Sequence, residues 1–225
     1  MRSNCYKTIL VFVILVMVVS VHAQRIRLNA YGSYVLDGTY HIYYKSGDFF
    51  DGNTTQGPQW GFGVEYMASP KYGIEFSCLS RNTKIFQEGT TSTDRRNASL
   101  NLNYFLLGIN AYPQSVSTKL QTFGGVSAGM IMQCGYSTNE FTGNIMNTAM
   151  TKFTWAARVG GIYWVSCQAG IKLQAQWLSS LQFNNGITSF DVYGSGFGPV
   201  DYSISNQFEL GSGLIIKLGK PTEKN

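Results

Sequence analysis

Large apolar residues alternate with small or polar ones along much of this chain. Residues 59–68 show the pattern most clearly, because one face of the extended chain would carry Trp60, Phe62, Val64, Tyr66 and Ala68, and the other Gln59, Gly61, Gly63, Glu65 and Met67. Successive side chains of a strand point to opposite sides, so this alternation predicts a strand with one apolar face and one small or polar face.

The same alternation recurs along the chain and predicts eight strands. These cover residues 25–36, 59–68, 72–83, 98–111, 119–133, 153–165, 171–177 and 204–218. The connections alternate between long polar segments (37–58, 84–97, 134–152 and 179–203) and short ones (69–71, 113–118 and 166–168). Outer-membrane barrels have long external loops and short periplasmic turns. We therefore expect an all-β fold, a closed antiparallel up-and-down transmembrane β-barrel of eight strands.

Alternation alone leaves open which face of the barrel is apolar. A soluble lipocalin-like barrel has the same period with its apolar face inward, around a ligand. Only 13% of the residues are charged, and the polar faces carry mostly Gly, Ser, Asn and Gln. A water-facing surface would carry many more Lys and Glu residues. This favours apolar faces toward lipid, and in residues 98–111 it predicts Leu100, Leu102, Tyr104 and Leu106 outward, with Ser99, Asn101 and Asn103 toward the lumen.

Aromatic residues near the strand ends support the membrane interpretation. Transmembrane barrels place aromatic girdles at both membrane interfaces. The residues predicted to form the girdles are Trp60, Tyr66, Tyr72, Trp155, Tyr163 and Trp177.

The two ends of the chain are expected to lie outside the barrel. Residues 1–23 read as a cleaved secretory signal peptide, with Arg2 and Lys7 before an apolar core and small residues before the cut. Residues 24–218 are then the barrel, and residues 219–225 form a short polar tail. Such a signal implies export to the cell outer membrane.

Charged residues gather on the polar faces of the predicted strands. Arg27, Glu65, Glu75, Lys172 and Lys217 are expected near the periplasmic end of the lumen, and Arg81, Arg158 and Glu209 higher up. An eight-stranded barrel has room only for side chains, and buried charges must be paired. We expect these residues to form a charge and hydrogen-bond network that plugs the lumen.

The signal peptide, the eight strands and the alternating connections resemble the small outer-membrane barrels of the OmpA transmembrane-domain and OmpX type, and the porin-family β-barrel domain of Bacteroidetes type. The resemblance implies outer-membrane lipids and, during insertion, the barrel-assembly machinery as partners. Such barrels often end on an aromatic residue, whereas the last strand here ends near Leu218.

Candidate chemistry is sparse. The mature chain has one histidine, His41, with Asp48 and Asp51 nearby in sequence, and lacks a His-x-Ser motif, so we expect no enzyme. The residues form no phosphate loop or zinc pattern, so we expect no cofactor or metal. The charge of +5 is too dispersed for nucleic acid. The leading function is a structural, adhesive or interaction role through external loops with an extracellular partner. The alternatives are a narrow porin-like channel for small solutes and a secreted ligand-binding barrel.

Overall fold

The computed structural model describes residues 25–36, 38–44, 49–88, 95–113, 119–139, 145–183 and 200–218. The predicted signal peptide (residues 1–23) and the polar tail (residues 219–225) lie outside these ranges. Almost all of the described residues form antiparallel strands, and none of them belongs to a helix long and apolar enough to cross a membrane.

Ten strand segments follow one another in the described part of the chain. They are β1 (Ile26–Val35), β2 (Gly38–Tyr44), β3 (Phe49–Thr54), β4 (Gly57–Ser69), β5 (Tyr72–Glu88), β6 (Arg95–Ala111), β7 (Leu120–Asn139), β8 (Ile145–Trp164), β9 (Ala169–Phe183) and β10 (Val200–Lys217).

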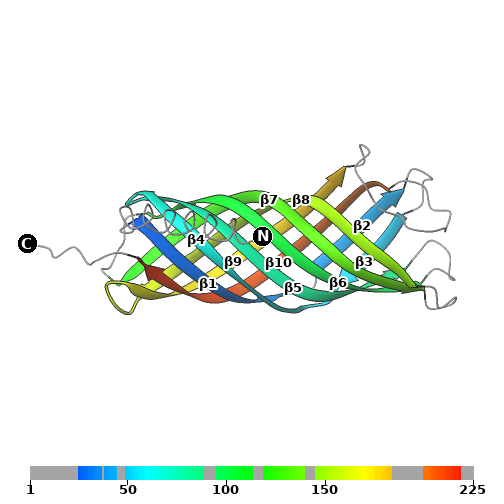
Figure 1. The fold of residues 1–225 in the computed structure, drawn as a ribbon, viewed down its shortest axis with the longest axis horizontal. Coiled ribbons are helices and arrows are strands. Elements are labelled where there is room, and N and C mark those ends of the chain that lie inside the picture. Colours follow the sequence, from blue (N-terminus) through cyan, green and yellow to red (C-terminus); the bar gives the residue numbers. More distant parts are fainter. Residues whose placement is uncertain are drawn as a thin grey trace, which may run out of the picture.

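The sheet closes on itself between its first and last strands. Arg27 of β1 lies opposite Lys217 of β10 on one side and opposite Glu65 of β4 on the other. The remaining strands pair in chain order from β4 to β10, and the long tilted strands wind around one axis (Figure 1). The expected closed antiparallel barrel is confirmed.

The ten segments make eight strands of the barrel, because β2 continues β1 and β3 continues β4. Segment β2 pairs with β10 directly beyond β1, and β3 pairs with β5 directly beyond β4. Backbone hydrogen bonds from Leu36 N to Phe208 O and from Thr55 N to Lys84 O carry the ladders through the interruptions. The register shifts by one residue at each interruption, as in a β-bulge.

Strands replace much of what the sequence pattern assigned to long loops. The prediction of a loop over residues 37–58 is wrong, since β2 and β3 form a hairpin there. Strands also extend into the segments 84–97, 134–152 and 179–203. Glycine and polar residues in these segments weaken the alternation of hydrophobicity, but the neighbouring strands still provide backbone hydrogen-bond partners.

The faces of β6 are the reverse of those predicted. Leu100, Leu102, Tyr104 and Leu106 point into the barrel and are buried. On the outside, Ser80 Oγ donates a hydrogen bond to Asn103 Oδ1 (2.9 Å), and Asn101 Nδ2 donates one to Asn82 Oδ1 (2.7 Å). The assumption that every apolar face meets lipid fails here, because the inside of this part of the barrel is itself an apolar core.

Candidate functional site in the barrel lumen

Five charged side chains gather inside the barrel near its short-turn end. We call Arg27, Glu65, Glu75, Arg158 and Lys172 the lower charge cluster. Glu75 is its centre, because its Oε2 lies 2.9 Å from Arg158 Nη2 and 3.9 Å from Lys172 Nζ. Strands β5 and β8 are not neighbours in the sheet, so the pair of Glu75 and Arg158 spans the lumen.

Neutral donors complete the surroundings of Glu75. Asn29 Nδ2 donates a hydrogen bond to its Oε1 (2.6 Å), Asn110 Nδ2 donates one to its Oε2 (2.9 Å), and the Tyr31 hydroxyl also donates to Oε1. Hydrogen bonds to a carboxylate are stronger than those between neutral groups. Glu75 is therefore held as a carboxylate, with donors from several strands around it.

Glu65 lies directly opposite Glu75 in the ladder between β4 and β5. Like charges in this position repel each other unless other groups intervene. Asn110 Nδ2 also donates to Glu65 Oε1 (2.7 Å), as does the Tyr112 hydroxyl (2.6 Å), and Arg27 Nη1 lies 3.6 Å from Glu65 Oε2. Asn110 thus links the two carboxylates, while cations approach them from opposite sides of the lumen.

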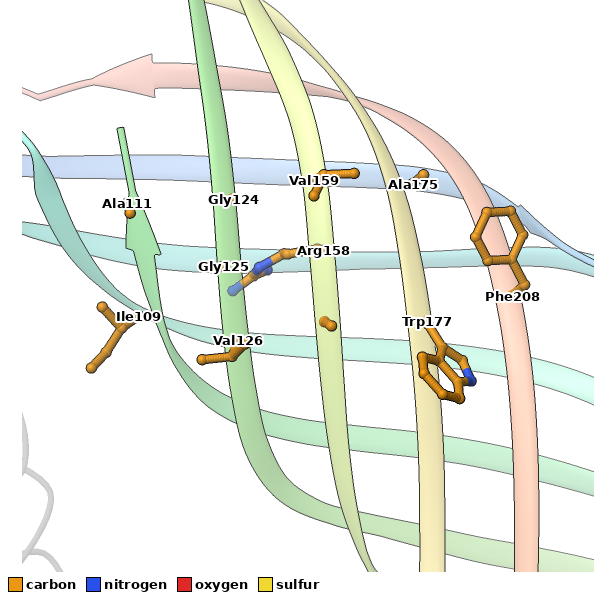
Figure 2. A pocket seen from close by; sticks show the side chains of 11 residues that line it. Ile109, Ala111, Gly124, Gly125, Val126, Arg158, Val159, Ala175, Trp177 and Phe208 are labelled. Atoms are coloured by element: carbon orange, nitrogen blue, oxygen red, sulfur yellow. The ribbon is translucent and has the colours of Figure 1, made fainter. Parts of the chain in front are cut away.

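Glycines make room for these side chains to cross the strands. Arg158 reaches over β7 beside Gly125 (Figure 2). Its Nε donates a hydrogen bond to Asn110 Oδ1 (3.1 Å). A Cβ atom at Gly125 would collide with that oxygen, and one at Gly73 would collide with the carboxylate of Glu65. An added side chain at either position would force the neighbouring side chain to shift.

A second group of polar side chains, the upper polar cluster, lies higher in the lumen. It comprises Gln59, Arg81, Tyr104, Gln207 and Glu209, all buried. Arg81 Nη1 and the Tyr104 hydroxyl both donate to Gln207 Oε1, at 3.2 and 3.1 Å. Gln59 Nε2 donates to Glu209 Oε2. This cluster connects β4, β5, β6 and β10 across the barrel.

Apolar side chains fill the rest of the lumen. One buried cluster at the short-turn end contains Met67, Tyr112, Phe123, Ile162, Trp164 and Ile215. A larger one contains Tyr31, Leu79, Ile85, Ala98, Leu100, Leu102, Tyr104, Leu106, Ile131, Ala156 and Leu178. The lower charge cluster touches both, since Tyr112 contacts Glu65 and Tyr31 contacts Glu75. The barrel interior is thus a packed core with a charged layer inside it.

The structure places the predicted lumen charges as follows. Arg27, Glu65, Glu75, Arg81, Arg158, Lys172 and Glu209 are buried, and Lys217 is partly exposed. Arg158 was expected higher in the lumen, with Arg81 and Glu209, and its guanidinium contacts Glu75 of the lower charge cluster. Its long side chain reaches toward the short-turn end, a direction that strand position alone does not reveal.

The neutral partners of the cluster were not singled out from the sequence. Asn29, Tyr31, Asn110 and Tyr112 lie on the same strand faces as the charges and provide most of the hydrogen bonds to the carboxylates. Asn29 and Tyr31 could have been found from the sequence, because each lies an even number of residues after Arg27 in the same strand and therefore on the same lumen face.

The predicted girdle residues lie on the outer surface in two groups. Tyr66, Tyr72 and Tyr163 lie toward the short-turn end and are exposed. Trp60 and Trp177 lie farther along their strands and are also exposed, while Trp155 packs edge-to-face on Trp177 with ring centroids 5.3 Å apart. Trp155 and Tyr163 are separated by roughly 26 Å of extended chain. For a strand tilted by about 40° from the barrel axis, this corresponds to about 20 Å along that axis.

The outer wall between these groups is hollowed over β6 to β10. The hollow has a volume of about 690 Å³. Its rim carries Ile109, Val126, Val159, Trp177 and Phe208, and small residues such as Gly124 line its floor (Figure 2).

Candidate catalytic and metal-binding groups are few in the described part of the chain. His41 lies in β2, opposite Asp51 of β3 in the backbone register, and Asp48 lies outside the described residues. Within the described ranges no group of three His, Cys, Asp or Glu residues could hold a metal ion. Cys78, Cys134 and Cys167 are free thiols.

Comparison with known proteins identifies the fold. No family model matches the chain, and no curated protein matches it in sequence. The outer membrane protease OmpT from Escherichia coli aligns with a TM-score of 0.54 and 11% identity, covering 87% of this chain and 97% of that chain. The outer membrane protein OprG from Pseudomonas aeruginosa aligns with a TM-score of 0.50 and 14% identity over the same shares, 87% and 97%. At these identities the likeness is one of fold alone: the chain is a closed antiparallel barrel of eight strands, as found in outer-membrane proteins.

Proposed function

We propose that this protein is an integral outer-membrane barrel of the small OmpA-like and OmpX-like kind, with a closed lumen and a non-catalytic role. It acts through its external end, as a structural element of the envelope or as a surface for adhesion or another interaction. Export by the predicted signal peptide is part of the proposal.

The observation that carries the proposal is the apolar outer wall. Large apolar side chains that are exposed surround the barrel on β1 and β4 to β10, among them Leu28, Phe62, Phe76, Leu107, Val126, Val159, Leu173 and Leu214. Monomers in water rarely expose a continuous apolar surface of this extent, whereas a lipid bilayer covers it. The alternative of a secreted ligand-binding barrel needs the apolar faces inward, and the wall argues against it.

The packed interior supports a closed lumen. The two apolar clusters and the lower charge cluster fill the barrel at successive heights, and all of their members are buried. A barrel of eight strands leaves an interior just wide enough for side chains. The alternative of a narrow solute channel would require this core to open.

The length of the strands supports a role for the external end. Segments β7 and β8 have 20 residues each. A tilted strand needs about 9–11 residues to cross a membrane. About half of each strand therefore projects. The outward polar pair of Ser80 with Asn103 lies at the middle of β5 and β6, and that of Asn82 with Asn101 lies just beyond it.

Two native cysteines can test the orientation. Cys134 lies opposite Asn101 on the projecting half of β7, and Cys167 lies in the short turn after β8; both are exposed. With Cys78 replaced by serine, we expect a membrane-impermeant maleimide to label Cys134 on intact cells. Cys167 should react only after the outer membrane is permeabilised.

Variants carrying one of the two thiols assign the label, and a known periplasmic protein controls for leakage. Labelling of Cys167 alone on intact cells would reverse the orientation. Absence of the protein from the outer-membrane fraction, with no heat-dependent shift of its gel mobility in SDS, would refute the membrane assignment.

Planar-bilayer recording tests the closed lumen. We expect no steady conductance from the purified protein, because an eight-stranded barrel leaves an interior just wide enough for side chains and two apolar clusters occupy it. A large, steady conductance would refute the closed lumen and favour the channel.

A further inference from the structure

A pocket of about 440 Å³ opens at the short-turn end of the barrel. Arg25, Arg27, Met67, Ala68, Ser69, Pro70 and Lys217 line it. Three of these residues are cations, and none of the lining residues, all within the described part of the chain, is a carboxylate. Ala68 belongs to the apolar outer wall, whereas Arg27 and Met67 belong to the lumen, so the pocket lies where the mouth of the barrel meets the lipid-facing surface.

The positions of the cations are unfavourable without an anion. Arg27 and Lys217 lie directly opposite each other in the ladder between β1 and β10. Like charges in this arrangement repel each other. Glu65 offsets part of the charge on Arg27, but it lies outside the pocket lining and also accepts hydrogen bonds from Asn110 and Tyr112.

Aromatic rings hold the cations in place. Lys217 Nζ lies 3.6 Å from the centre of the Trp164 ring, and Arg27 Cζ lies 4.9 Å from that of Tyr112. These cation–π contacts orient the charged groups without neutralising them.

Arg27 also has unused hydrogen-bonding capacity. Its side chain is more than nine-tenths buried, and its Nη1 lies 3.6 Å from Glu65 Oε2, an ion-pair distance too long for a hydrogen bond. A buried donor without a partner is costly unless a ligand or water satisfies it. A phosphate group fits this requirement, because arginine binds phosphate oxygens with two parallel N–H groups and lysine adds a point charge.

We propose that Arg25, Arg27 and Lys217 form a binding site for a phosphate group at the short-turn mouth of the barrel. The phosphate belongs either to the headgroup of a phospholipid in the adjacent leaflet or to a small free phosphate. The opening of the pocket beside Ala68 and Pro70 gives a headgroup access from the lipid side.

The test uses the full mature chain, folded in a detergent that contains no phosphate. One arm titrates inorganic phosphate by calorimetry, and the other titrates phosphatidylglycerol by native mass spectrometry, with diacylglycerol as the phosphate-free reference. We expect Arg25→Gln combined with Lys217→Gln to weaken binding by at least about tenfold, because each change removes a charged hydrogen-bond donor. Lys217→Arg should keep the binding.

Lys71→Gln is the matched control. Lys71 is exposed in the turn that contains Ser69 and Pro70, but it does not line the pocket. The heat-dependent gel shift checks that each variant is folded. If the double variant does not fold, Arg25→Gln alone serves, since Arg25 is exposed. Binding of phosphatidylglycerol alone identifies a headgroup, and binding of inorganic phosphate identifies a free anion. The proposal fails if wild type binds neither probe, or if the folded pocket variant binds as tightly as the Lys71 control.

Discussion

Replacing Glu75 by glutamine should destabilise the barrel severely. Glu75 is fully buried and lies within ion-pair distance of both Arg158 and Lys172. Glutamine has nearly the same shape, so packing is preserved while the negative charge is lost. Its amide group would also face the amide donors of Asn29 and Asn110, which now bond to the carboxylate.

The expected size follows from the two cations left behind. Removing one partner of a buried ion pair costs about 3–5 kcal/mol, because the other charge stays buried without compensation. Glu75→Gln leaves Glu65 as the remaining carboxylate of the lower charge cluster. We therefore expect the free energy of unfolding to fall by about 3–5 kcal/mol.

Urea unfolding in lipid vesicles, followed by tryptophan fluorescence, measures this change. Ser77→Ala is the matched control: Ser77 is buried two residues away, and its hydroxyl has no hydrogen-bond partner among the described residues. In a double-mutant cycle, Glu75→Gln and Arg158→Met should cost clearly less together than the sum of the two separate losses. A loss below about 1 kcal/mol for Glu75→Gln would refute the reasoning, because it would mean that water or relaxation already compensates the cations.

Three further predictions use the same unfolding assay. Gly125→Ala should cost about 1–3 kcal/mol through overcrowding against Asn110 Oδ1, whereas Gly124→Ala should cost little, since the nearest atom to its added Cβ lies 3.9 Å away; equal losses would mean that the lumen beside Gly125 has room for a side chain. Leu102→Ala should cost about 2–5 kcal/mol by leaving a cavity, and Leu107→Ala less, because lipid refills its site; the reverse order would restore the faces first expected for β6. Val126→Arg, on the outer wall, should cost about 2–4 kcal/mol in a bilayer, and no loss would place that wall in water.

The period of two in the sequence was enough to predict the barrel. A strand with one face toward lipid and the other toward the packed lumen keeps a strict alternation of apolar and small or polar residues, as around Glu65. This alternation predicts both the strand and the inward direction of the Glu65 side chain. The two ends of the chain and the tips of the loops are not part of that pattern.

The pattern failed where the two faces of a strand stop differing in polarity. In β6 both faces contain apolar residues near Leu106 and Leu107, and the burial of Leu102 depends on Leu79 and Ile131, with which it shares the apolar lumen core. In β2 the register follows from β10 and not from local hydrophobicity. The contact of Arg158 with Glu75 could not be read from strand positions, because it depends on the direction in which the long Arg158 side chain extends across the lumen.

The ion pair of Glu75 and Arg158 also has a consequence for the order of folding. Strands β5 and β8 are separated by β6 and β7, so hairpins can form one after another without bringing the two charges together. The pair forms only when the sheet has curled and the lumen has dried. Until then, the charges of the lower charge cluster keep their water, which favours a soluble unfolded chain over aggregation. The same residues that lock the finished barrel thus help to keep the unfolded chain in solution.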